Sequence, residues 1–134
     1  MGPTILCVDH DDLVLEVTRI PLEQHGYRVM TADNGSEAIS LLAQTNDDVA
    51  LVLMDWGLPN GDNTAVVKKL KTLRPNIRVL VTSGYGTPAV LPPDARKHVA
   101  GFLAKPYLPN ELIRAVRHAL RFVSGYGFSR AVAS

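Results

Sequence analysis

A run of six consecutive apolar residues, Val49 to Met54 (VALVLM), limits what this chain can fold into. The run has the length of a strand, but it lacks the polar–apolar alternation of a strand with one face in water. Strands that are apolar on both faces are typical of parallel sheets, which are covered by helices on both sides. The rest of the sequence therefore has to supply covering helices and further strands.

Four other short runs are rich in β-branched and apolar residues, and stretches with helical spacing of apolar residues separate them. The predicted strands are 5–8, 28–32, 49–54, 77–81 and 101–104. The predicted helices lie between 13 and 26, at 36–44, between 62 and 75, and at about 110–123. Parallel strands need helical crossovers, so this alternation predicts an α/β fold, a doubly wound parallel sheet with helices on both faces.

The first predicted helix carries its apolar residues at Leu13, Val17 and Ile20, which the i, i+4, i+7 spacing places on one face. Pro21 lacks a backbone donor, so we expect it to disturb this helix. Gly26 is placed to end it.

The segment from 84 to 100 contains too many helix-breaking residues for a regular fourth helix. Gly86, Pro88, Pro92 and Pro93 leave only 94–98 as a helical turn or two. We therefore expect a short or irregular fourth helix.

The length of 134 residues suits a single domain with a sizeable core. We place this domain at 1–123 and interpret the Gly- and Ser-containing segment 124–134 as a C-terminal tail or linker. The single cysteine, Cys7, lies in an apolar run and predicts a buried thiol and a reducing compartment. With no targeting segment in view, we expect a cytoplasmic protein.

The charge balance excludes two classes of partner. Fourteen basic and thirteen acidic residues give a formal net charge of +1, without a basic run. We therefore expect no nucleic acid and no membrane surface among the partners. The longest apolar run is also far too short to cross a bilayer.

Polar residues follow the predicted strands where each strand ends. They are Asp9, His10, Asp11 and Asp12 after the first, Asp33 after the second, Asp55 after the third, Thr82 and Ser83 after the fourth, and Lys105 with Pro106 after the fifth. In a doubly wound sheet these strand ends meet at one edge, where ligands bind. Crowded carboxylates there favour a divalent cation such as Mg²⁺, and an aspartate can carry phosphate as an acyl phosphate. The sequence therefore indicates phosphoryl transfer.

Four segments carry a resemblance to a known family: ILCVDHDD, LVLMDWGLP, VLVTSG and FLAKPY. Together and in this order they make residues 4 to 123 similar to the receiver (REC) domain of two-component response regulators. The resemblance implies a flavodoxin-like sheet with strand order 2-1-3-4-5. It also implies a phosphoprotein in phosphorelay signalling, whose partner is a histidine kinase or a histidine phosphotransfer protein.

The resemblance assigns roles to individual residues. Asp55, four residues before Pro59, would be the phosphoacceptor that forms 4-aspartylphosphate. Lys105 would contact the phosphoryl group, and Pro106 would follow a cis peptide bond. Asp9, Asp55 and the backbone carbonyl of Gly57 would bind the cation.

The same resemblance implies a switch, in which a hydroxyl after the fourth strand turns toward the phosphoryl group. Ser83 lies 22 residues before Lys105 and 28 after Asp55, which is the family's usual spacing and favours Ser83 over Thr82. Phe102 takes the position of an aromatic that moves with this hydroxyl. A static core role for Phe102 stays open.

His10 departs from the family pattern, because this position normally holds the second acid of the metal-binding pair. Imidazole is a poor ligand for Mg²⁺ and suits softer metals. We expect weaker Mg²⁺ binding, with Mn²⁺ better tolerated or Asp11 partly substituting. His10 without any metal role stays open, while Asp11 and Asp12 also fit as acids at a helix start. Asn63, in place of a usual glycine, predicts a mild change of loop.

Three classes of function follow from these residues. The first is a phosphorylatable receiver, which is no enzyme beyond its own phosphorylation and dephosphorylation. The second is a receiver-like interaction module that works without phosphate, which His10 and the irregular fourth helix motivate. The third is an enzyme, which two features disfavour. A dehalogenase-type phosphatase needs a second aspartate two residues after its nucleophile, where this chain has Gly57, and the acidic first loop does not suit the phosphate of a flavin.

The output of the chain is not written in the sequence. No DNA-binding segment follows 123, so we expect a single-domain regulator or a receiver from a hybrid histidine kinase or larger regulator.

Overall fold

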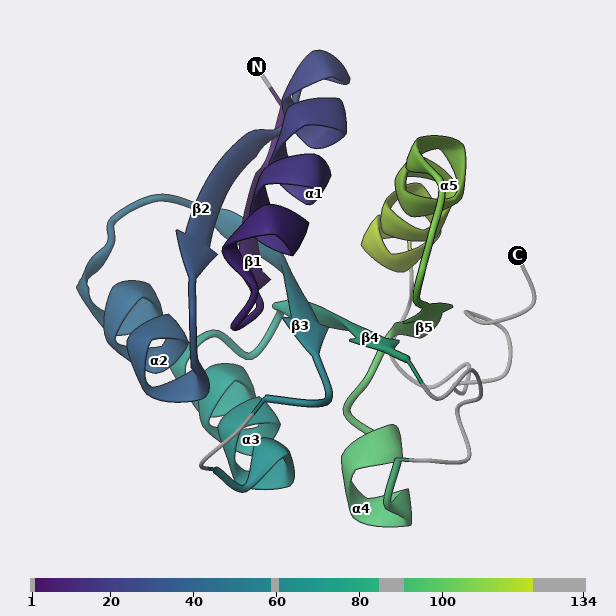
Figure 1. The fold of residues 1–134 in the computed structure, drawn as a ribbon. Coiled ribbons are helices and arrows are strands. Elements are labelled where there is room, and N and C mark those ends of the chain that lie inside the picture. The colour runs from purple at the N-terminus through teal and green to yellow at the C-terminus, as the bar shows by residue number, and fades with distance from the viewer. Residues whose placement is uncertain (1, 59–60, 85–90, 122–134) are drawn as a thin grey trace.

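Five parallel strands form the centre of the molecule in a computed structural model that describes residues 2–58, 61–84 and 91–121. The strands are β1 (Thr4–Val8), β2 (Arg28–Ala32), β3 (Val49–Asp55), β4 (Arg78–Ser83) and β5 (Gly101–Ala104). Their order across the sheet is β2-β1-β3-β4-β5, and every neighbouring pair is parallel (Figure 1). The predicted strand order is confirmed.

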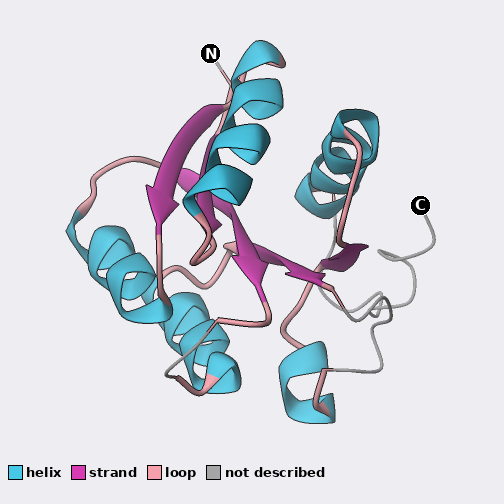
Figure 2. Ribbon diagram, in the orientation of Figure 1, coloured by secondary structure: helices cyan, strands magenta, loops and turns pink. Residues whose placement is uncertain are grey.

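Helices cover both faces of this sheet, as Figure 2 shows. They are α1 (Asp12–Gln24), α2 (Gly35–Gln44), α3 (Asn63–Leu73), α4 (Pro93–Arg96) and α5 (Pro109–Leu120). Helices α1 and α5 lie on one face, and α2, α3 and α4 lie on the other. None of the helices in the described ranges is long and apolar enough to cross a membrane.

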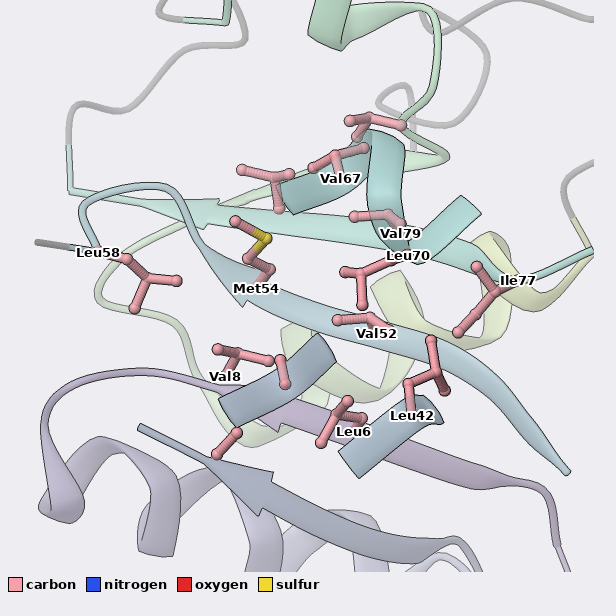
Figure 3. Packing of buried hydrophobic residues seen from close by; sticks show 14 of the residues in the cluster. Leu6, Val8, Leu42, Val52, Met54, Leu58, Val67, Leu70, Ile77 and Val79 are labelled. Atoms are coloured by element: carbon pink, nitrogen blue, oxygen red, sulfur yellow. The ribbon is translucent and has the colours of Figure 1, made fainter. Parts of the chain in front are cut away.

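The strands divide their side chains between two cores, one under each helical layer, because side chains alternate along a strand. In β1, Ile5 joins the core under α1 and α5, whereas Leu6 joins the core under α2 and α3. The continuous apolar run in β3 alternates in the same way, with Leu53 on the first side and Met54 on the second. Figure 3 shows the second core, where strand residues pack against Leu42, Val67 and Leu70.

The predicted boundaries hold for most elements. β5 has the predicted bounds, and α4 is a single turn, as the prolines indicated. β4 runs further than predicted, so Thr82 and Ser83 are its last residues and do not follow it. The predicted tail, 124–134, lies outside the described residues, and the domain boundary stays a prediction.

The expected apolar face of α1 is wrong, and Pro21 does not end the helix. The helix continues past Pro21 to Gln24, and its supposed apolar face at Leu13, Val17 and Ile20 is 70%, 54% and 43% exposed. The carbonyl that loses its donor to the proline belongs to the exposed Val17, where water can satisfy it. The buried face instead contains Thr18, Pro21 and Leu22. Gly26, with φ of 89°, ends the helical turn as predicted.

Arg74, the residue after α3, holds a loop at the end of the sheet where the strands begin. Its guanidinium donates to the backbone carbonyls of Leu42 (3.2 Å), Thr45 (2.9 Å) and Asp47 (3.1 Å). These carbonyls belong to the end of α2 and the loop before β3. One side chain therefore holds the entry to the central strand.

Candidate functional site

The carboxyl ends of three strands bring two aspartates and a lysine together. Asp9 follows β1, Asp55 ends β3, and Lys105 follows β5. β1 and β3 are neighbours in which Val8 pairs with Met54, so the two aspartates lie side by side. Both residues are almost fully buried, with 4% of Asp9 and 5% of Asp55 exposed.

Lys105 supplies positive charge to both carboxylates. Its Nζ lies 2.7 Å from Oδ2 of Asp9 and 3.4 Å from Oδ2 of Asp55. Burial lowers the pKa of Lys105, but the hydrogen bond to Asp9 and the charges of both aspartates outweigh it, so the pKa is raised. The peptide bond from Lys105 to Pro106 is cis, which is the geometry the resemblance implied.

Backbone amides fix the other oxygens of the two aspartates. The N–H of Asp11 donates to Oδ1 of Asp9 at 2.9 Å, and the N–H of Gly57 donates to Oδ1 of Asp55 at 3.1 Å. Both carboxylates are therefore oriented before any ligand arrives. One ammonium group faces two carboxylates, which leaves one negative charge uncompensated in a buried site.

His10 faces this pair from the surface. Its side chain is 53% exposed, and its Nδ1 lies 3.5 Å from Oδ2 of Asp55 and 3.8 Å from Oδ1 of Asp9. One ligand atom from each of these three residues lies within 4.8 Å of the other two, so together they could hold a metal ion. The carboxylate oxygens fit Mg²⁺, and the imidazole nitrogen does not.

Three other acids near the strand ends have different roles. Asp11 caps α1 by accepting from the N–H groups of Leu13 and Val14, and Asp12 begins the helix. Both act as helix-start acids, and Asp11 lies outside the three-residue group. Asp33 lines the same open cavity of about 590 Å³ as His10, but it accepts from Asn34 and does not join the group.

The two hydroxyl residues at the end of β4 belong to different faces of the sheet. Thr82 pairs with Asp55 in the ladder and lines a small cavity with Thr18 and Tyr107, under α1 and α5. Ser83 is the next residue, so it points to the opposite face. Phe102 packs against the core of that opposite face. The alternation therefore puts Ser83, and not Thr82, on the same face as Phe102.

Two interactions around the site escaped the sequence analysis. Asn63 does more than change a loop mildly, because its side chain donates to the carbonyl of Trp56, the residue after Asp55. The hydroxyl of Tyr107 is 2.7 Å from that of Thr18 and joins the loop after Lys105 to α1. Burial raises the pKa of Tyr107. Only its place just after Lys105 and Pro106 could have drawn attention to Tyr107.

Known proteins share both the sequence pattern and the fold of this chain. The family model described as "Response regulator receiver domain" matches residues 5–117. A sensor kinase, CckA of Brucella abortus, is 31% identical over 120 residues, which are 87% of this chain and 12% of that kinase. The chain thus spans a small part of this relative, and about half of a phosphate regulon regulator, PhoB of Pseudomonas aeruginosa (53%).

Two solved structures illustrate the structural likeness. The CheY-like receiver domain protein of Methanospirillum hungatei has a TM-score of 0.78 and 28% identity, covering 90% of this chain and 94% of its own. A response regulator from Burkholderia pseudomallei, solved with a phosphorylated aspartic acid, calcium ion and citrate, has a TM-score of 0.75 and 26% identity. That match covers 90% of this chain and 67% of the other. This chain belongs to the response regulator receiver domain family.

Proposed function

We propose that Asp55 accepts a phosphoryl group from a phosphorylated histidine of a histidine kinase or histidine phosphotransfer protein. The observation that carries the proposal is the arrangement around Asp55. This buried carboxylate has one oxygen fixed by the N–H of Gly57 and the other 3.4 Å from the ammonium group of Lys105. A nucleophile held beside a cation is suited to attack an anionic phosphoryl group.

The transfer breaks one bond and forms one. A carboxylate oxygen of Asp55 attacks phosphorus while the bond from phosphorus to the donor nitrogen breaks, and the electron pair of that bond stays on the imidazole. The positive charge of Lys105 stabilises the phosphoryl oxygens during their transfer to Asp55. Since Lys105 also bonds to Asp9 at 2.7 Å, its position does not depend on Asp55 alone.

A divalent cation completes the charge balance of the site. When bound, the cation neutralises negative charge on the phosphoryl oxygens. Asp9 and Asp55 would hold it, with the backbone carbonyl of Gly57. The carboxylates of Asp9 and Asp55 and the ammonium group of Lys105 leave a net negative site that attracts a cation.

Ser83 and Phe102 would report the phosphorylated state to the surface. A phosphoryl group on Asp55 offers three acceptor oxygens to a nearby hydroxyl. Ser83 is buried at the end of β4, and Phe102 is half-buried on the same face of the sheet. A turn of the Ser83 hydroxyl toward the phosphoryl group would make room for Phe102 to move inward.

The relatives support this proposal. The Burkholderia regulator carries a phosphorylated aspartic acid and a calcium ion, and Brucella CckA is a sensor kinase. The alternative of a module that works without phosphate is not favoured, because Asp9, Asp55 and Lys105 are all present and in contact. In this role the chain catalyses only its own phosphorylation and dephosphorylation.

Incubation with acetyl phosphate or phosphoramidate, with Mg²⁺ or Mn²⁺, tests the proposal by intact mass spectrometry. We expect one phosphoryl adduct in the wild type and none in Asp55→Asn. The matched control is Asp48→Asn, at an exposed aspartate without a hydrogen bond or ion pair in the described part of the chain, and it should still form the adduct. Absence of an adduct with both donors and both metals would contradict the proposal.

A further inference from the structure

His10 is the residue of the site that the proposed function leaves without a role. It lies on the loop between β1 and α1, between the buried Asp9 and the helix cap Asp11. Its side chain is half-exposed, so it is not a histidine of the core. It makes no hydrogen bond within the described ranges, since its contacts with the two carboxylates, at 3.5 and 3.8 Å, exceed hydrogen-bond length.

We propose that His10 is a nitrogen ligand of the divalent cation, so that this site selects a first-row transition-metal ion such as Mn²⁺ or Co²⁺ over Mg²⁺. This inference rests on the cation site of the proposed function and assigns it a different metal preference. It concerns equilibrium binding of the ion and does not depend on phosphorylation.

The distances fit a shared ion. In an octahedral site with bonds of about 2.1 Å, neighbouring ligand atoms lie about 3 Å apart and opposite ones about 4.2 Å. Nδ1 of His10 lies 3.5 Å from Oδ2 of Asp55 and 3.8 Å from Oδ1 of Asp9, and one ligand atom from each of the three residues lies within 4.8 Å of the other two. Inward shifts of roughly 0.5 to 0.8 Å would bring neighbouring ligand atoms to the separation that one octahedral ion requires.

Lys105 and the backbone amides leave room for this arrangement. At Asp9, Lys105 binds Oδ2 and His10 approaches Oδ1. At Asp55 both approach Oδ2, Lys105 at 3.4 Å and His10 at 3.5 Å, and the lone pairs of that oxygen can serve the ammonium group and an ion together. Each carboxylate oxygen has a second lone pair, so the N–H groups of Asp11 and Gly57 do not block an ion. The exposed imidazole can turn inward at little cost, because no hydrogen bond holds it.

The chemistry of the donor set decides the preference. Mg²⁺ is a hard ion that takes oxygen ligands and demands near-ideal octahedral geometry. Imidazole suits the transition ions, whose affinity for a nitrogen-containing site rises from Mn²⁺ through Co²⁺ to Ni²⁺ and Cu²⁺. A neutral imidazole in place of a carboxylate also removes one negative charge, which weakens the attraction for Mg²⁺ without a compensating bond.

Equilibrium titrations at fixed pH test this inference. Binding of Mg²⁺, Mn²⁺ and Co²⁺ is measured by calorimetry and by the fluorescence of Trp56, which follows Asp55 and is partly buried. The variants are His10→Asp, which restores an oxygen ligand, and His10→Ala, which removes the nitrogen without adding charge. His25→Asn is the control, because His25 is exposed at the far end of α1.

We expect the ratio of Mn²⁺ to Mg²⁺ affinity to be on the order of tenfold higher in the wild type than in His10→Asp. His10→Ala should weaken Mn²⁺ and Co²⁺ binding and leave Mg²⁺ binding nearly unchanged. The absorption spectrum of bound Co²⁺ should differ between the wild type and both His10 variants, and His25→Asn should match the wild type.

Equal ratios in the wild type and both His10 variants, with unchanged Co²⁺ spectra, would overturn the inference. The proposed function fails in a different way, by the absence of a phosphoryl adduct from a protein that binds Mn²⁺. A wild type that is phosphorylated equally well with either ion and binds both equally would keep the function and refute the role of His10.

Discussion

Replacement of Asp55 by asparagine should stabilise the protein when no divalent cation is present. Asparagine has nearly the same shape, and its side-chain oxygen can still accept from the N–H of Gly57, as Oδ1 of Asp55 does at 3.1 Å. The substitution therefore removes a buried negative charge, and it puts an amide nitrogen in place of Oδ2, the oxygen beside Lys105. Its effect on the free energy of unfolding reports whether that charge is compensated.

The distances give the magnitude. With an effective dielectric constant of about 20, the attraction between Asp55 and Lys105 at 3.4 Å is about 5 kcal/mol. The ligand atoms of Asp9 and Asp55 lie within 4.8 Å of each other, so their repulsion is about 3.5 kcal/mol or more on the same basis. The two terms nearly cancel, whereas desolvation of a carboxylate costs several kcal/mol. We expect Asp55→Asn to raise the free energy of unfolding by about 1–3 kcal/mol.

Urea unfolding in EDTA, followed by circular dichroism, measures this gain. Asp48→Asn is the control, since Asp48 is exposed, and it should stay within about 0.5 kcal/mol of the wild type. Saturating Mn²⁺ should stabilise the wild type more than Asp55→Asn and narrow the difference. If Asp55→Asn is less stable than the wild type in EDTA, Lys105 and Gly57 already compensate the charge, and the argument for a cation is wrong.

Other consequences of the structure can be checked by unfolding and labelling. Arg74→Ala should lower the free energy of unfolding by about 2 kcal/mol, because it removes three hydrogen bonds from a charged group to backbone carbonyls. Arg74→Lys should recover only part of this loss. Equal stability of the wild type and both variants would contradict these hydrogen bonds. Leu22→Ala should lower the free energy of unfolding by about 2–5 kcal/mol, and Leu13→Ala, at an exposed residue, by less than about 0.5 kcal/mol. If the two variants lose similar amounts of stability, Leu13 is buried. Burial raises the pKa of Cys7 to about 12, so the folded protein should resist thiol reagents at pH 8 until urea unfolds it, and fast labelling of native protein would place the thiol at the surface.

The sheet could be predicted because each strand carries its own signal. The apolar run of β3 needs no partner to be recognised, and Gly101 to Ala104 lies between a proline-rich segment and Lys105. The order of the strands and the roles of Asp9, Asp55 and Lys105 came from the resemblance together with the rule that strand ends meet.

The direction of α1 could not be predicted, because apolar residues occur on several of its sides. Leu13, Val17 and Ile20 share one face by spacing, while Leu22 belongs to another. Periodicity identifies a face without saying whether the sheet covers it. The buried side carries Thr18, whose hydroxyl forms a hydrogen bond with Tyr107, a residue 89 positions away in the chain.

The position of the His10 side chain was equally out of reach. Spacing placed this residue at the second acid position, but only the rotamer brings Nδ1 to 3.5 Å from Asp55. Whether a half-exposed side chain turns toward the site or toward water depends on neighbours that a single sequence does not arrange. Its contact with both carboxylates is therefore a finding of the structure.

The most direct test of the account asks whether Asp55 itself carries the acyl phosphate. The protein is treated with acetyl phosphate and Mn²⁺ and then with borohydride, which reduces an acyl phosphate to an alcohol and so converts the modified aspartate to homoserine. Peptide sequencing by mass spectrometry then finds the converted residue. We expect homoserine at position 55, and conversion at another aspartate, or at none, would contradict Asp55 as the phosphoacceptor.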